Sequence, residues 1–300
     1  MIKSDFQKYL DAETVAKISS MELRARFVVE GFITGLHKSP YHGFSVEFAE
    51  HRQYMPGDEI KKIDWKVFGR TDRFYVKQFE EETNLRAYLI IDASKSMSFK
   101  LSGKVSKLEY ATYLASALSL MMIRQKDAVG LTIYDENVRT FLPPKASSIY
   151  LKEIFKELSN VKGRNKTSTA NSLHKIAEQV KKRSLIIIFS DLFDEPKNIL
   201  NTLKHFRHKK NEVIVFHILD PAEKDFSFSN DSIFLDMETN EKISTQPNHI
   251  KKTYQKAMKE FIAHYQKECR NQLIDYCLVD TSTSFDVPLL EYLHKRKKLF

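Results

Sequence analysis

The sequence predicts an α/β fold, a mostly parallel sheet flanked by helices. Between residues 84 and 222, short apolar runs typical of buried strands alternate with longer segments whose apolar residues recur every three or four positions. Two of these runs, residues 85–91 and 185–189, are each followed closely by an aspartate. Such alternation is typical of parallel strands joined by right-handed helical crossovers. With 300 residues, the chain also has enough material for a large core.

Residues 1–83 have a different pattern, and we expect a small β-rich region preceded by a helix. The helix is expected near residues 21–36. Pro56 and Gly57 then form a strong type II turn signal, because proline presets φ and glycine accepts a positive φ. Short alternating segments at residues 63–68 and 75–80 suggest strands. Trp65 in the first segment is expected to be buried, since a lone tryptophan flanked by apolar residues is usually packed.

Residues 84–300 are expected to form the sheet unit with its helices. Ser106 and Glu109 have the spacing of a capping box, which predicts a helix starting after the strand at 85–91. Later strands are expected at residues 128–134, 138–141, 185–190, 213–219 and 276–279. Helices are expected from residues 148, 167, 195 and 249 and across 289–293. A hairpin is predicted for residues 232–235 and 242–244.

A D-x-S-x-S motif, formed by Asp92, Ser94 and Ser96, follows the strand at residues 85–91. It places one carboxylate and two hydroxyl groups on a single tight loop. Three oxygen ligands of this kind suit a hard divalent cation, above all Mg²⁺. Alone, however, the motif is more typical of a strand end followed by a serine turn.

Two further residues follow in an order that favours a metal site. Thr167 precedes a helix-like run, and Asp191 follows the strand at 185–190. Asp92 and Asp191 should lie on neighbouring strand ends, where open α/β sheets carry their sites. Taken alone, Thr167 is typical of a helix N-cap and Asp191 of a loop acid.

Together these residues resemble the metal-ion-dependent adhesion site of the von Willebrand factor A fold. Thr167 is the better match for the threonine of that site because it stands six residues before Leu173, and Thr169 is the alternative. The resemblance implies a Rossmann-type, von Willebrand A-like sheet. It also implies Mg²⁺ or Mn²⁺ held by Asp92, Ser94, Ser96, Thr167 and Asp191.

Short motifs before and including the D-x-S-x-S sequence resemble a bacterial family, number 58 in the series of domains of unknown function. The motifs are Ser39-Pro40-Tyr41-His42-Gly43, Pro56-Gly57-Asp58, Ile63-Asp64-Trp65, Arg70-Thr71-Asp72 and the stretch from Asp92 to Met97. The resemblance implies two parts, a family-specific region (1–83) and a von Willebrand A-like domain (84–300). Because such proteins are often encoded beside MoxR-type AAA+ ATPases, it also implies a chaperone-like or assembly role.

The ligand set favours a divalent-cation-dependent protein-binding module over an enzyme. Neutral hydroxyl ligands leave an ion electrophilic, and it can then take a carboxylate from a protein partner. The alternative is a metal-dependent phosphohydrolase or nuclease using Asp92 and Asp191. Ser94 stands where a haloacid-dehalogenase-like phosphatase needs its second aspartate, and two-metal hydrolysis usually needs more acids. We therefore expect no enzymatic activity.

Composition limits the classes of partner and the cellular compartment that we expect for this protein. The net charge of +9 lies largely in basic clusters near the ends of expected helices, and no nucleic-acid-binding motif is visible, so we expect no nucleic-acid partner. No apolar run approaches the roughly 18 residues of a membrane span, and the first residues lack the apolar segment of a signal peptide. The two cysteines are expected to be reduced, which favours a cytoplasmic location.

Overall fold

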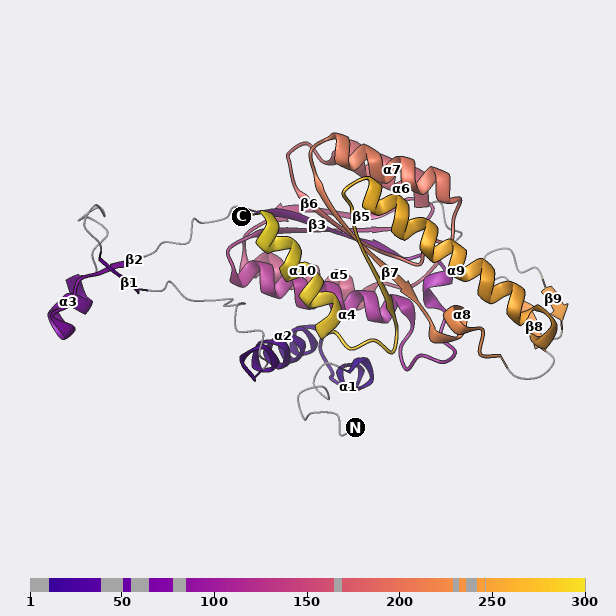
Figure 1. The fold of residues 1–300 in the computed structure, drawn as a ribbon, viewed down its shortest axis with the longest axis horizontal. Helices are drawn as coiled ribbons and strands as arrows, with labels where there is room; N and C mark the ends of the chain where they lie inside the picture. Colours follow the sequence, from indigo (N-terminus) through magenta and orange to yellow (C-terminus); the bar gives the residue numbers. More distant parts are fainter. Residues whose placement is uncertain are drawn as a thin grey trace.

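The computed structural model describes residues 11–38, 51–54, 65–77, 85–164, 169–228, 232–235, 242–245 and 247–299. Its centre is a six-stranded sheet with the strand order β10-β7-β6-β3-β4-β5 (Figure 1). Its strands are β3 (Arg86–Asp92), β4 (Ala128–Tyr134), β5 (Val138–Lys145), β6 (Leu185–Ser190), β7 (Glu212–Leu219) and β10 (Asp275–Asp280). All neighbouring strands are parallel except β4 and β5, which form the predicted hairpin. The predicted α/β class with a mostly parallel sheet is confirmed.

Helices cover both faces of this sheet. The elements are α4 (Lys107–Arg124), α5 (Ser148–Asn160), α6 (Thr169–Gln179), α7 (Pro196–His208), α8 (Pro221–Asp225), α9 (Pro247–Asn271) and α10 (Asp286–Leu299). Leu89 of β3 belongs to the core cluster built with α4, α5 and α10, whereas Ile90 belongs to the cluster built with α6, α7 and α9. Successive strand residues point to opposite faces, so a strand that is buried on both sides reads as an uninterrupted apolar run.

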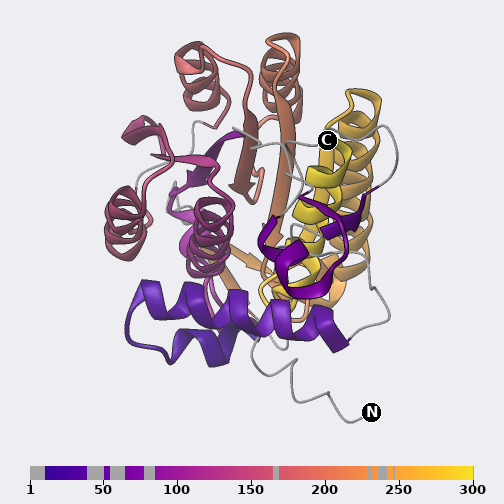
Figure 2. The same ribbon diagram turned by 90° about the vertical axis from the view of Figure 1, so that its left-hand side faces the viewer.

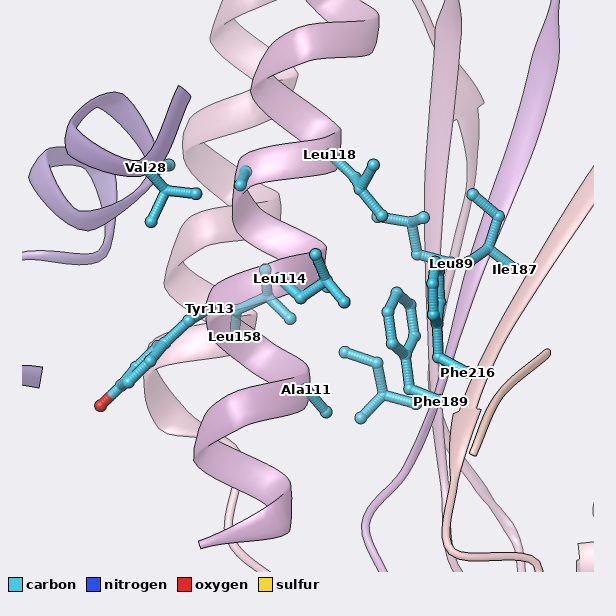
Figure 3. Close-up of a cluster of buried hydrophobic side chains, with 14 of the residues drawn as sticks. Val28, Leu89, Ala111, Tyr113, Leu114, Leu118, Leu158, Ile187, Phe189 and Phe216 are labelled. Atoms are coloured by element: carbon cyan, nitrogen blue, oxygen red, sulfur yellow. The ribbon is translucent and has the colours of Figure 1, made fainter. Parts of the chain in front are cut away.

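Helix α4 lies at the centre of the larger core. In Figure 3, Ala111, Leu114 and Leu118 of α4 face Leu89 and Phe216 of the sheet. The capping box predicted from Ser106 and Glu109 is present at the start of this helix. It fixes the start of α4 at Lys107, after the segment that follows the D-x-S-x-S loop.

The first two helices, α1 (Ala12–Ala16) and α2 (Met21–Lys38), join this core from outside. Helix α2 packs on α4 and α5, and both Val28 and Phe32 are buried there (Figure 2, where α2 is indigo). This second layer explains why most residues of α4 are buried, including those that face away from the sheet. The part of the N-terminal region that forms α1 and α2 is therefore continuous with the core of the sheet unit.

The remaining described part of the N-terminal region differs from the expected series of strands. Strands β1 (His51–Gln53) and β2 (Tyr75–Lys77) pair antiparallel, but Trp65–Thr71 forms helix α3. A short alternating segment does not distinguish a strand from a single helical turn or two, which explains the error. The expected burial of Trp65 is also wrong, because this residue is 57% exposed, and its ring meets those of Phe68 and Phe74 edge-on. The Pro56-Gly57 turn lies outside the described residues.

Three further features agree with expectation. Strands β8 (Ser232–Leu235) and β9 (Lys242–Thr245) form the predicted antiparallel hairpin. Cys269 and Cys277 are buried free thiols that belong to the clusters on opposite faces of the sheet. Within the described part of the chain, no helix combines the length and apolar character needed to span a membrane.

Candidate metal centre

An aspartate stands at the carboxyl end of each of the five parallel strands. Because the strands run in one direction, these five carboxylates gather along one edge of the sheet, where α/β folds carry their sites. They are Asp92 at the end of β3, Asp135 after β4, Asp191 after β6, Asp220 after β7 and Asp280 at the end of β10. Their different partners show which of them have charge compensation within the protein.

Three of the five carboxylates have evident structural roles. Asp135 forms an ion pair with Arg139, and Asp280 forms one with Lys224 at 3.0 Å. Asp220 accepts hydrogen bonds of 3.0 to 3.1 Å from three successive backbone amides, in the loop that follows the D-x-S-x-S motif. Several hydrogen bonds to the charged form lower the pKa of Asp220, although burial opposes them.

Asp92 is fully buried and, among the described residues, forms no ion pair with a lysine, arginine or histidine. Its Oδ1 accepts the backbone amide of Ser94 at 2.9 Å. Its Oδ2 accepts the hydroxyl of Ser190 at 2.8 Å and that of Thr169 at 3.5 Å. Burial, together with the charge of Asp191, raises the pKa of Asp92 to about 6. The hydrogen-bond partners of this buried carboxylate are therefore one backbone amide and two hydroxyl groups, all of them neutral.

The two serines of the motif lie beside this carboxylate. The hydroxyl oxygens of Ser94 and Ser96 are 3.0 Å apart, and Ser96 also hydrogen-bonds the side chain of Asp191. Tyr134, at the end of β4, is buried at the same place, and burial together with the charge of Asp92 raises its pKa well above the ordinary value. The structure thus brings four of the predicted residues together, namely Asp92, Ser94, Ser96 and Asp191.

The fifth predicted residue, Thr167, lies outside the described residues. The chain on either side of it is held at the site. Before it, the Arg164 amide donates to the Ala93 carbonyl at 3.0 Å, and a Cβ on Gly163 would lie 2.0 Å from Ser98 Oγ. After it, Thr169 begins α6 and is the alternative threonine already placed against Asp92.

Sequence analysis missed Lys107, which is fully buried at the edge of the site. Its ammonium nitrogen lies 2.8 Å from Asp191 Oδ2 and 2.7 Å from Glu223 Oε1. Burial alone would lower the pKa of Lys107, but the two carboxylates outweigh it and raise this pKa. Burial likewise opposes ionisation of Asp191, yet the charge and hydrogen bond of Lys107 lower its pKa overall.

The sequence did contain a signal for Lys107. It occupies the first turn of α4, where the helix dipole disfavours a cation, and it shares the apolar face of Ala111 and Leu114. A lysine in that position must have acidic partners from elsewhere in the fold. Glu223 also stands in a capping box with Asp220, and nothing in that local pattern indicates a role near Asp92.

The charges and donors fit a divalent cation with oxygen ligands. Asp92, Asp191 and Glu223 bring three carboxylates and Lys107 brings one ammonium group, so when all are ionised the cluster has an excess of two negative charges. Within the described residues, no three histidine, cysteine or acidic side chains are placed to hold a metal by themselves, so hydroxyl groups would have to complete the ligand set. Carboxylates supplemented by hydroxyls suit Mg²⁺ or Mn²⁺ rather than zinc, which prefers nitrogen and sulfur.

The sheet, its helices and the row of strand-end aspartates define an α/β protein with a mostly parallel sheet. A model of the family described as "Protein of unknown function DUF58" matches residues 50–263, and the chain belongs to this family. A similar curated protein, an uncharacterised protein of Mycobacterium bovis, is 23% identical over 246 residues, which cover 80% of this chain and 74% of that protein.

Solved structures also resemble this chain. BatB from Bacteroides thetaiotaomicron, described as a conserved hypothetical protein, is 19% identical with a TM-score of 0.49 and covers 71% of this chain and 99% of its own. The von Willebrand A domain of SpRpn10 is 12% identical with a TM-score of 0.42 and covers 69% of this chain and 94% of its own.

Proposed function

We propose that this protein is a binding module that captures a protein partner through a divalent cation, and that it is not an enzyme. The cation, Mg²⁺ or Mn²⁺, would be held by Asp92, Ser94, Ser96, Asp191 and either Thr167 or Thr169. One observation carries the proposal. Asp92 is a fully buried carboxylate with only neutral hydrogen-bond partners in the described structure, and burying a charge in this way is costly unless a cation compensates it.

The chemistry of the donors favours capture of an acidic side chain. When bound, the cation supplies a positive centre whose charge the neutral serine and threonine hydroxyls leave largely uncompensated. Asp92 and Asp191 would fix its position, since each is held by hydrogen bonds from its own loop. A carboxylate from a partner is the complementary ligand for such a centre.

A phosphohydrolase or nuclease using Asp92 and Asp191 is less well supported. One oxygen of Asp191 is already engaged by Lys107, which leaves fewer free acceptor positions for a second metal or for proton transfer. Ser94 and Ser96 hydrogen-bond each other through their side chains, and among the described residues Ser94 has no histidine partner that would activate it as a nucleophile.

The partner we propose is a MoxR-type AAA+ ATPase offering an acidic residue, with the complex acting in the cytoplasm in a chaperone-like or assembly role. The resemblance of the sequence motifs to their family is the support for this partner. The basic character of the chain, with a net charge of +9, would steer an acidic surface toward it.

Isothermal titration with Mg²⁺ and Mn²⁺ tests the cation site directly. We expect the wild-type protein to bind and Asp92→Ala to lose binding. Asp225→Ala serves as the matched control, because Asp225 is an exposed acid in α8 at the same edge of the sheet. Equal cation affinity for wild type and Asp92→Ala would refute the proposal.

A pull-down with the ATPase, with and without EDTA, tests the partner. Capture should require the cation and Asp92, and capture that persists in EDTA would contradict cation-dependent binding. Assays with phosphomonoesters, phosphodiesters and ATP should show no hydrolysis above background. Metal-dependent hydrolysis that is lost in Asp92→Ala would replace the binding module with the enzyme alternative.

A further inference from the structure

Lys107 forms ion pairs with two carboxylates. One of them, Asp191, is a proposed ligand of the cation, and the other, Glu223, is not. Asp191 Oδ2 lies 2.8 Å and Glu223 Oε1 lies 2.7 Å from the same nitrogen, so the two oxygens are no more than about 5.5 Å apart. The side chains of Lys107 and Asp191 are fully buried, and that of Glu223 is 14% exposed. At this burial the charges are weakly screened, and each influences the others strongly.

Lys107 is a potential competitor for the cation. Its ammonium group already forms an ion pair with Asp191. By itself, this positive charge would cancel one of the two negative charges that Asp92 and Asp191 provide. A divalent cation would then face a ligand set with a net charge of only −1. The carboxylate of Glu223 restores the balance because it neutralises Lys107 from the other side.

Glu223 is fixed in this position by the start of helix α8. Its Oε2 accepts the backbone amide of Asp220 at 2.9 Å, which leaves Oε1 for Lys107. The rings of Phe99 and Phe193 lie with their centroids 5.8 and 5.0 Å from the Lys107 nitrogen and enclose it. Lys107 is therefore held between its two acids.

We propose that Glu223 does not ligate the divalent cation but sets the affinity of the site for it, by acting as the counter-ion of Lys107. Glu223 is then a positioning residue that acts through Lys107, because its carboxylate keeps the charge of Lys107 from reducing the attraction of the site for a divalent cation. This inference rests on the proposed cation site, and it adds a determinant of affinity on a different helix.

The test compares the affinities of purified variants for Mg²⁺ and Mn²⁺ by isothermal titration. Glu223→Gln should bind the cation about tenfold or more weakly, because Lys107 is left with an uncompensated charge a few ångströms from the site. The double variant Lys107→Met/Glu223→Gln removes both charges and should return to within about threefold of wild type. Glu109→Gln is the matched control, since it makes the same change in the capping box of α4.

Each outcome separates this inference from the proposed function. If wild type binds and Glu223→Gln binds equally well, the inference is overturned while the cation site stands. If the double variant is as weak as Glu223→Gln, the geometry of α8 rather than charge controls affinity, and the inference fails. If wild type binds neither cation, both proposals fall. Should Glu223→Gln not fold, near-wild-type affinity of the double variant supports the inference and its loss overturns it.

Discussion

Replacing Asp92 with asparagine should stabilise the protein in the absence of cations. Asp92 is fully buried, and its charge is opposed by burial and by Asp191. Asparagine has the same shape and retains an oxygen that can accept from the Ser94 amide. The substitution therefore removes the charge with little change in packing.

The expected gain follows from the pKa of Asp92, which is about 6 in the folded protein against an ordinary value of 3.8. A carboxyl with a raised folded-state pKa binds its proton more tightly in the folded chain than in the unfolded chain. Folding is therefore penalised progressively as the pH rises from about 4 to about 6, and above that range the whole penalty remains. A shift of about two units corresponds to about 3 kcal/mol. Asp92→Asn should be more stable than wild type by up to this amount at pH 7.5, and about equally stable at pH 4.

Urea unfolding followed by circular dichroism, in EDTA at about pH 4, 5.5 and 7.5, measures this difference. Asp135→Asn is the control, because Asp135 is also a buried strand-end acid but has Arg139 as its partner. That variant should lose stability at pH 7.5. If Asp92→Asn is less stable than wild type at pH 7.5 without a cation, the charge of Asp92 is not a cost to folding, and the proposal that a bound cation compensates this charge is refuted.

Three further outcomes are expected. Affinity for Mg²⁺, measured by titration calorimetry, should fall as the pH drops below about 6, because Asp92 must lose its proton before it can bind a cation. An affinity that is constant down to pH 5 would count against Asp92 as a ligand. Lys107→Ala should destabilise the protein by about 3–5 kcal/mol in urea unfolding at pH 7.5, because Asp191 and Glu223 are then buried together without the lysine ammonium group. A loss of stability below about 1 kcal/mol would contradict the ion-pair geometry. Acrylamide should quench the fluorescence of Trp65 strongly in the native protein, and weak quenching would show that this side chain is covered.

The central strands β3 and β6 were predictable because they are buried on both faces and are therefore apolar almost throughout. Parallel pairing of β3 with β6 brings their carboxyl ends together. The proximity of Asp92 and Asp191 follows from this topology alone. The pattern of the sequence therefore contained most of the candidate site.

The role of Lys107 was not predictable in the same way. Its partners are Asp191, directly after β6, and Glu223 in α8, so the contact depends on the packing of three separate elements rather than on a local pattern. For Trp65 the prediction failed for a different reason. Local pattern was the only information available for residues 63–68, and a few alternating residues fit a short helix as well as a strand.

The layer formed by α1 and α2 has a consequence for how the chain is made. These helices leave the ribosome before α4, the helix that covers Val28 and Phe32, which follows roughly 80–95 residues later. At a synthesis rate of about 5–20 residues per second, the interval is about 5–20 s. During this interval the side of α2 that packs on α4 and α5 lacks these two helices. The early part of this protein is therefore exposed to aggregation or to capture by cellular holdases until the centre of its fold has been synthesised.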